Sequence, residues 1–421
     1  MPLDDQVDYR WVREESAVRF VRAVHEHGLA NSVIYREPPV PGITHARVAE
    51  MTGISRPTVS GLADRAHRFM ITSGSEPGLA LNPSAMGVAV GVDFSYGHNR
   101  VALSDIHGQL FLPKHPAAYE MSVTSETEAD DSLAWATERI TALVAEAKLQ
   151  LTDIVTIGVA LAGATDQATN LLVPDSRPMN AGWQSLSPVD ELPVRLGIHA
   201  PVYLDNDTNA SAIAEHGWGA ARGAANVLYI KLNRSCNCGL IIRHEIYRGA
   251  QGFAGEIGHV LVPVAHGEDG DGGLAELHDV FSVAALRRRF GIEDSASELV
   301  AAAYENDTMR EAFMHGAHVL GGVLAPIIDV LNPERIIIGG KLGYECFPLI
   351  ASRLNAALEG HHSSPAIKSI RGKVVRGQIP GRTALRGAIA LALKKTLPEL
   401  LAREIPSEVA RKREKRNART A

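Results

Sequence analysis

Residues 201–219 read PVYLDNDTNASAIAEHGWG, in which a strand-like run is followed directly by a helix-like run. Its first half is a short apolar run of the kind found in buried β-strands, and its second half, from 208 to 217, has a helical pattern. Asn206 and Asp207 stand at the joint, where they are suited to cap the helix. A strand that leads directly into a helix is typical of α/β proteins.

Further short β-rich runs lie on both sides of this stretch, separated by helical segments such as 308–331. This alternation predicts an α/β architecture in which helices cover both faces of the sheets. The strands gather in two clusters, near 86–162 and 201–262, and we therefore expect two similar lobes. The first lobe is placed at 86–200 and the second at 201–395, with C-terminal helices that return to the first.

The N-terminal segment, residues 1–85, reads as a separate winged helix-turn-helix domain. Its residues 42–71, GITHARVAEMTGISRPTVSGLADRAHRFMI, predict two helices around a tight turn. Thr44 is suited to cap the first helix, Gly53 to make the turn and Ser55 to cap the second. This is the pattern of a helix-turn-helix.

Two flanking segments extend that pattern. Residues 16–27, SAVRFVRAVHEH, carry apolar side chains at helical spacing and predict a preceding helix. The run SGSEPGLALNP, which follows Ile71 closely, is long enough for a small wing. The same sequence also fits an ordinary helical pair without a role in DNA binding, and both readings stay open at this point.

The predicted helix-turn-helix is positively charged although the whole chain is negative. Residues 43–72 hold four arginines against two acidic residues, whereas the chain has 42 basic and 48 acidic side chains and a formal charge of −6. A recognition helix carries arginines and hydroxyl groups into the major groove. The side chains expected to contact double-stranded DNA are Arg47, Arg56, Thr58, Ser60 and Arg65.

Composition excludes several other classes of protein. Hydrophobic residues are 45% of the chain and charged residues 21%, as in ordinary soluble globular proteins. Three cysteines are too few for a disulfide framework. Because neither a signal peptide nor an apolar run of about 18 residues is apparent, we expect a cytoplasmic protein without a membrane partner. Residues 403–421, rich in Lys and Arg, are expected to be a disordered tail, with phosphate contact as the alternative.

An ordered set of motifs resembles the ROK family of repressors, open reading frames and sugar kinases, and specifically its transcription-regulator branch. Besides the stretch at 205–219, the motifs are GVDF (91–94), GVALAGATD (158–166), NAGW (180–183), RGAQGFAGEIGHV (248–260) and LNPERIIIGG (331–340). Together with the helix-turn-helix, the resemblance covers roughly residues 12–395. It implies an actin-like (ribonuclease H-like), two-lobed domain of the sugar-kinase type, with a ligand bound between the lobes.

The resemblance also implies which residues hold the ligand. Asp207 matches the base that accepts a proton from a sugar hydroxyl in the family's kinases, and Asn206 stands beside it. Glu256 and His259 match family contacts to the sugar, and Asn180 matches a further contact. The alternative is that Asn206 and Asp207 only cap a helix and that His259 is an ordinary buried histidine.

The phosphate loops depart from the kinase pattern. The first loop of family kinases has the pattern Asp-x-Gly-x-Thr. Here Ser95 stands in place of the glycine after Asp93, and the Thr region is replaced by Tyr96-Gly97-His98. The second loop reads NRSCNCG (233–239) where kinases have a run of glycines that lets the backbone approach phosphate. We therefore expect no ATP site, no cofactor and no enzymatic activity.

A structural zinc site implied by the resemblance is also missing its ligands. Relatives follow the GH histidine with three cysteines, whereas HGEDGDGGLAELHD (266–279) has none. Cys236 and Cys238 are expected to be small buried side chains. Two readings are open for the loop residues His266, Glu268, Asp269, Asp271 and His278: weak binding of a cation, or solvation, which is usual for carboxylates in a glycine-rich loop. Solvation is the expectation, so no metal is predicted. A sugar-contacting Glu of relatives falls near Ala275. Either Glu276 takes its place or the ligand is not the usual hexose.

These observations predict a DNA-binding transcription regulator, a repressor, that senses a sugar or a related small molecule as a homodimer or tetramer. Paired half-sites raise affinity and specificity above what one short helix provides, which is the reason for expecting an oligomer. Two alternatives stay open. One is an ATP-dependent sugar kinase with an accessory helix-turn-helix domain, and the other is a regulator that has lost sugar sensing.

Overall fold

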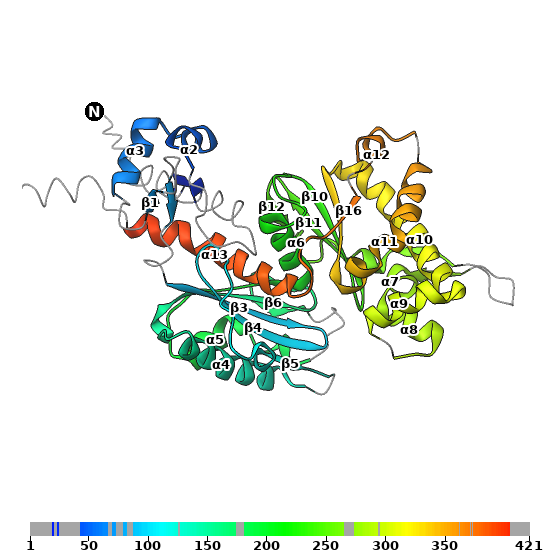
Figure 1. Ribbon diagram of the computed structural model, residues 1–421, viewed down its shortest axis with the longest axis horizontal. Helices are drawn as coiled ribbons and strands as arrows, with labels where there is room; N and C mark the ends of the chain where they lie inside the picture. The colour runs from blue at the N-terminus through cyan, green and yellow to red at the C-terminus, as the bar shows by residue number, and fades with distance from the viewer. Residues whose placement is uncertain are drawn as a thin grey trace, which may run out of the picture.

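The computed structural model describes residues 19–20, 23–24, 43–65, 70–72, 79–81, 87–124, 127–173, 181–264, 273–293, 295–361, 363–370, 372 and 374–404. Figure 1 shows an N-terminal helix-turn-helix, two α/β lobes and a long C-terminal helix, α13, that runs from the helix-turn-helix to the junction of the lobes. The N-terminal domain comprises α2 (His45–Thr52), α3 (Arg56–Arg65), β1 (Met70–Thr72) and β2 (Leu79–Leu81).

The helix-turn-helix forms as its capping residues predict. The Thr44 side chain accepts a hydrogen bond in the first turn of α2, and Gly53 ends that helix with a left-handed φ of 69°. Ser55 Oγ accepts a hydrogen bond at 3.4 Å from the Thr58 amide in the first turn of α3. Strands β1 and β2 pair antiparallel, which confirms the wing. The described residues within 16–27 are helical, as expected.

The sheet of the first lobe has five strands in the order β5-β4-β3-β6-β9. β3 pairs antiparallel with β4, whereas β3, β6 and β9 run parallel. Helices α4 and α5 pack on one face of this sheet. The elements are β3 (Val88–Ser95), β4 (His98–Ser104), η3 (Pro116–Tyr119), β5 (Glu120–Ser122), α4 (Ala129–Glu146), η4 (Leu151–Asp153), β6 (Ile154–Leu161), β7 (Thr165–Asp166), β8 (Leu171–Leu172), η5 (Ala181–Gln184), α5 (Pro188–Leu196) and β9 (Val202–Asn206).

The second lobe repeats this topology with the order β12-β11-β10-β15-β16. Helices α10 and α11 pack on one face of its sheet. The elements are α6 (Asp207–Trp218), β10 (Val227–Leu232), β11 (Cys236–Ile242), β12 (Glu245–Tyr247), η6 (Ile257–His259), β13 (Leu261–Pro263), β14 (Leu274–Glu276), α7 (Leu277–Val280), α8 (Val283–Phe290), α9 (Ala296–Glu305), α10 (Asp307–Leu331), β15 (Arg335–Gly339), α11 (Gly340–Glu359), α12 (Pro365–Ile370), β16 (Val374–Arg376) and α13 (Thr383–Glu404).

The shared strand order confirms the two similar lobes that the strand clusters predict. Strand pairing differs from the sequence boundary at one point, because β9 belongs to the first sheet, which therefore reaches residue 206 rather than 200. Helix α13 extends to Glu404, so the predicted tail at 403–421 begins with two helical residues. The rest of that tail lies outside the described residues. The placement of the domain boundaries otherwise stays a prediction.

Helices α6 and α13 join the parts of the molecule. α6 contacts strands of both sheets, and α13 packs along α6 and against β3 and β6. The helices approach closely because Gly387 of α13 faces the Ala210 carbonyl of α6. A single buried apolar cluster contains Phe20, Val48 and Val59 of the N-terminal domain together with Ile389 and Leu393 of α13. The helix-turn-helix therefore shares a core with the helix that connects the lobes.

Helix α10 is the most apolar long helix of the described residues. Its 25 residues satisfy the length and mean hydropathy of a membrane-crossing helix, although Asp329 ends its uncharged run after 17 residues, 312–328. Its side chains Leu320, Leu324 and Ile328 are fully buried in the core of the second lobe. Burial against other helices of the lobe is the property of a core helix, and it accounts for the apolar composition.

Candidate functional site

The end of β9 and the start of α6 place the polar residues of the quoted stretch at the junction of the lobes. Asn206 caps α6, because its Oδ1 accepts hydrogen bonds from the amides of Thr208 at 2.8 Å and Asn209 at 3.3 Å. Its Nδ2 donates to the Gly163 carbonyl at 2.7 Å. The capping role is thus present, and a ligand contact by the remaining N–H of Asn206 stays a prediction.

A buried ion pair fixes the junction from the second lobe. Asp205 is fully buried, and its Oδ2 accepts hydrogen bonds from Arg248 Nε at 2.9 Å and Nη2 at 2.5 Å. Both guanidinium N–H groups donate to this one oxygen, and Asp205 Oδ1 accepts from the Asn206 amide and from Asn209 Nδ2, each at 2.9 Å, so both oxygens of the buried carboxylate are paired. Arg248 opens the motif RGAQGFAGEIGHV (248–260), but its role could not be predicted from that motif. Its pairing with an acidic residue could have been suspected, because Arg248 is a basic residue at the start of a motif and the chain has the acidic stretch DND at 205–207.

Asp207, the residue that matches the kinase base, is engaged by a lysine. Lys231 Nζ of β10 lies 2.6 Å from Asp207 Oδ2, and the two side chains are only 13% and 12% exposed. An ammonium at this distance forms an ion pair with the carboxylate and occupies one of its oxygens. The sequence reasoning missed Lys231, although a lysine within the otherwise apolar strand VLYIKL was a visible signal.

Glu256 and His259 lie together beside this pair, as the resemblance implies. Glu256 immediately precedes η6 and His259 ends it, and Glu256 Oε2 lies 4.0 Å from His259 Nε2. Burial raises the pKa of Glu256, and the negative charge of Asp207 adds to the rise while His259 opposes it. The charge of Asp207 acts on Glu256, so the two carboxylates lie within electrostatic range of each other.

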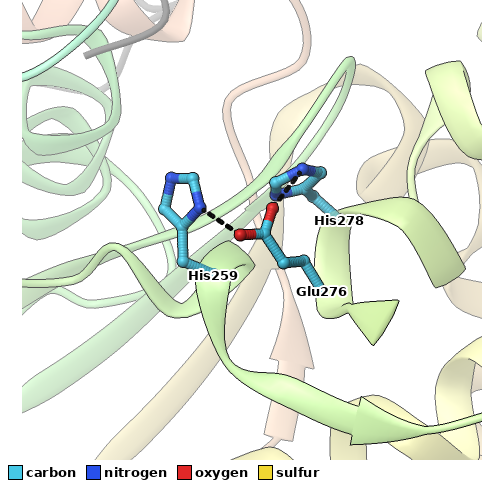
Figure 2. Close-up of side chains that lie close together, drawn as sticks. All are labelled: His259, Glu276 and His278. Carbon is cyan, nitrogen blue, oxygen red and sulfur yellow. Dashed lines mark hydrogen bonds and ion pairs between the residues drawn. The ribbon is translucent and has the colours of Figure 1, made fainter. Parts of the chain in front are cut away.

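Glu276 joins the same group of side chains (Figure 2). Its Oε1 lies 3.2 Å from His259 Nδ1, and its Oε2 lies 3.1 Å from His278 Nε2. Glu276 therefore stands beside the GH histidine, as the first of the two alternatives for this position expected. The expectation that His278 is solvated is wrong, because its side chain is 14% exposed and its ring packs edge-on to that of His259.

The two altered phosphate loops touch each other. The guanidinium of Arg234, between β10 and β11, lies 3.4 Å from the centre of the Tyr96 ring, between β3 and β4. This is a cation–π contact between the two lobes. Asp93 at the start of the first loop is buried and accepts hydrogen bonds from Ser95 and His98. Burial by itself raises the pKa of Asp93. The hydrogen bonds from His98 and Ser95 and the charge of His98 together outweigh burial, so the net pKa of Asp93 lies below its usual range.

The cysteines of the second loop are buried, as predicted. Cys236 is 0% and Cys238 2% exposed. Burial raises the pKa of both thiols, so they stay protonated near neutral pH. A protonated, buried thiol is a poor metal ligand, which agrees with their interpretation as small core side chains.

The predicted DNA-contacting side chains lie on the helix-turn-helix. Arg56 and Thr58 are exposed in the first turn of α3, and Ser60 is half-buried. Arg47 is exposed on α2, where its Nη1 lies 2.7 Å from Glu50 Oε2. Arg65 ends α3, and its side chain lies outside the described residues. Also outside them are Asn180, His266, Glu268, Asp269 and Asp271.

Comparison with known proteins identifies the family. The model of the ROK family matches residues 90–395. The xylose repressor of Bacillus subtilis strain 168 is 24% identical over 355 residues, which cover 80% of this chain and 87% of the repressor. The crystal structure of a ROK family transcriptional regulator, a homologue of the E. coli MLC protein, superposes with a TM-score of 0.71 at 18% identity, covering 94% of this chain and 99% of that one.

Kinases share the fold as well. The crystal structure of a ROK family glucokinase from Streptomyces griseus, in complex with glucose and AMPPNP, superposes with a TM-score of 0.53 at 22% identity and covers 73% of this chain and 99% of that one. The structural neighbours thus confirm the actin-like, two-lobed architecture that the motifs predict. The chain belongs to the ROK family, and its relatives over most of its length include transcription regulators.

Proposed function

We propose that this protein is a cytoplasmic, DNA-binding transcription regulator, acting as a repressor, whose ROK domain senses a sugar or a related small molecule. The observation that carries the proposal is the shared apolar core between the helix-turn-helix and α13. A change in the arrangement of the lobes reaches the DNA-binding domain through this core. The similarity to a xylose repressor over 80% of the chain supports the same function.

The exposed face of α3 supports DNA recognition. Arg56 and Thr58 project from its first turn, the part of a recognition helix that meets base edges. The first helix of such motifs crosses the phosphate backbone of the DNA. Arg47 lies on the corresponding helix, α2, and we expect it to contact phosphate. We expect Arg65 and Ser60 to add contacts along the same helix.

The junction of the lobes supports ligand sensing. Asp207, Glu256, His259 and Glu276 offer donors and acceptors of the kind that bind adjacent hydroxyl groups of a sugar, and we expect Asn180 to complete them. The ligand would act by binding one arrangement of the lobes better than another. A homodimer or tetramer then converts this difference into a change in the spacing of paired helix-turn-helix modules.

The same region supports a function without catalysis. A kinase base must lie within hydrogen-bond reach of the substrate hydroxyl, whereas one oxygen of the Asp207 carboxylate is already engaged by Lys231 at 2.6 Å. A nucleotide needs glycine-rich loops that let backbone amides approach phosphate, whereas Arg234 and Tyr96 fill the two loops and contact each other. We therefore infer that the chain binds its ligand without phosphorylating it.

DNA binding is tested by selecting high-affinity sites from random duplexes with the full chain. We expect a palindromic site, and we expect Arg56→Ala to weaken binding to it by about 10- to 100-fold, because a bidentate base contact contributes about 1–3 kcal/mol. Arg47→Ala should instead weaken binding to all duplexes equally and reduce the salt dependence, because a phosphate contact releases counterions.

Arg353→Ala serves as the matched control, since Arg353 is exposed on α11, in the second lobe. Its affinity for the selected site should equal that of the wild type. Failure to enrich any palindromic sequence, or equal losses for Arg56→Ala and Arg353→Ala, would contradict the proposed DNA-binding role.

Ligand sensing is tested by a thermal-shift screen of the full chain with sugars, sugar phosphates, amino sugars and AMPPNP. A ligand that binds only the folded state should raise the melting temperature by about 2–4 °C at high saturation. We expect such a rise for one class of sugar, its loss in Glu256→Ala and no rise with AMPPNP. If no sugar raises the melting temperature, the protein is a regulator without sugar sensing. A higher melting temperature with AMPPNP would favour the kinase alternative.

A further inference from the structure

We propose that His259, Glu276 and His278 form a binding site for a single divalent transition-metal ion, most suitably Zn²⁺. The resemblance implies a zinc bound by one histidine and three cysteines in this region, and this chain does not fit that set. No cysteine lies between His259 and His278, and the described Cys236 and Cys238 are buried with protonated thiols. The donor set assembled here is different in chemistry, with two imidazoles and one carboxylate.

Backbone pairing brings the three residues together although His259 lies 17 positions before Glu276 and 19 before His278. His259 is the last residue of η6, and Glu276 is the last residue of β14. β13 and β14 pair antiparallel, with Glu276 opposite Leu261, and the Leu277 amide donates to the Val260 carbonyl at 3.0 Å. His278 follows in the first turn of α7. The hairpin thus places a carboxylate and a second imidazole against His259, regardless of the loop that connects its strands.

The ligand atoms converge. One potential ligand atom from each of the three residues lies within 4.8 Å of the others, and Glu276 is already in contact with both rings (Figure 2). Two ligands of one Zn²⁺ lie about 3.3 Å apart, since each lies about 2.0–2.1 Å from the ion. Small side-chain rotations therefore suffice to place His259, Glu276 and His278 around an ion.

The chemistry of the donors selects the kind of metal. Neutral imidazoles favour zinc and related transition metals, and a single carboxylate balances part of the charge. A set of two histidines and one glutamate leaves a coordination position open, in contrast to a closed structural site. The open side is that of His259, whose side chain is 49% exposed, compared with 14% for His278. Glu256, at 4.0 Å from His259 Nε2, is placed to orient that ring.

Hydrogen bonding without an ion is the competing explanation for the cluster. Glu276 can accept hydrogen bonds from both histidines and so hold η6 to the hairpin by itself. The two explanations differ in one measurable property, which is the binding of added metal. That measurement needs neither DNA nor sugar, so its result is independent of the function proposed above.

The experiment uses the full chain after treatment with a chelator. Zn²⁺ is titrated by calorimetry, metal content is measured by mass spectrometry after desalting, and Co²⁺ is added as a visible probe of the ligand set. The test variants are Glu276→Gln and His278→Gln. The control variant is His361→Gln, which removes an exposed histidine that follows α11, outside the cluster.

We expect one Zn²⁺ per chain in the wild type and in His361→Gln, with a visible Co²⁺ spectrum in both. Glu276→Gln and His278→Gln should lose at least about 100-fold in Zn²⁺ affinity. Changing a residue that only hydrogen-bonds to a metal ligand lowers metal affinity by about 10- to 100-fold, and removing a ligand itself should lower it more. Melting temperatures without metal show whether a variant is folded. Absence of bound metal in the wild type, or equal affinities in folded Glu276→Gln and His361→Gln, would overturn the proposal.

Discussion

Replacement of Gly387 by alanine is expected to destabilise the protein by at least about 3 kcal/mol. A Cβ at this position of α13 would lie 1.6 Å from the carbonyl oxygen of Ala210 in α6. The obstacle is helix backbone, which cannot rotate away as a side chain can. The helices must therefore separate, and the separation disturbs the core that α13 shares with the helix-turn-helix. Chemical denaturation of the purified variant measures the loss.

Gly322→Ala is the matched control. Gly322 is also helical, in α10, but it is exposed, and a Cβ there would meet nothing within 4 Å. Alanine is favoured over glycine in helices by about 1 kcal/mol, so Gly322→Ala should be slightly more stable than the wild type. The prediction for Gly387 is wrong if both variants are stabilised, since helix propensity would then outweigh the close approach of α6 and α13.

Replacement of Glu215 by alanine is expected to cost about 3–5 kcal/mol. The Glu215 carboxylate is buried near the end of α6 and accepts hydrogen bonds from the amides of Ala220 at 2.7 Å, Gln378 at 3.1 Å and Ile379 at 2.9 Å. It thereby holds the segment that leads into α13. Alanine leaves three amide groups without an acceptor, and each buried unpaired group costs about 1–3 kcal/mol. Unfolding in denaturant is again the measurement.

Glu215→Gln separates the role of the hydrogen bonds from that of the charge. Burial raises the pKa of Glu215 above its ordinary value of 4.5, even though the three amides lower it. A raised folded-state pKa means that stability is lost as the pH rises above the unfolded pKa and through the folded one. The unfolding free energy of the wild type should therefore fall relative to that of Glu215→Gln as the pH rises from about 4.5. A difference that does not change with pH would contradict this account.

Much of the architecture could be read from local sequence. Thr44, Gly53 and Ser55 specify the helix-turn-helix because caps and left-handed turns depend on one residue and its near neighbours. The strand and helix of 201–219 form as predicted for the same reason. Asp207, Glu256 and His259 could be named because each lies in a distinctive motif, and the structure brings these three side chains to one region.

The partners of those residues could not be read in the same way. Lys231 meets Asp207 only because β10 of the second sheet lies beside the start of α6. Arg248 reaches Asp205 across 43 positions of sequence, and Tyr96 reaches Arg234 from the other lobe. No local periodicity encodes such pairs, since each depends on how the two sheets are placed on either side of α6.

The amino-acid sequence alone was enough to predict an α/β chain of the ROK type with a helix-turn-helix in front, and it has Ser95 and the run NRSC (233–236) where the resemblance expects phosphate-loop glycines. These properties are local, because they depend on side-chain periodicity, capping and the presence or absence of particular residues. Only the tertiary structure decided that the kinase-type carboxylate is paired with Lys231 and that Glu276 and His278 stand against His259. Contacts of this kind arise from strand pairing and helix packing between distant segments, and the free energy that forms them belongs to the whole fold.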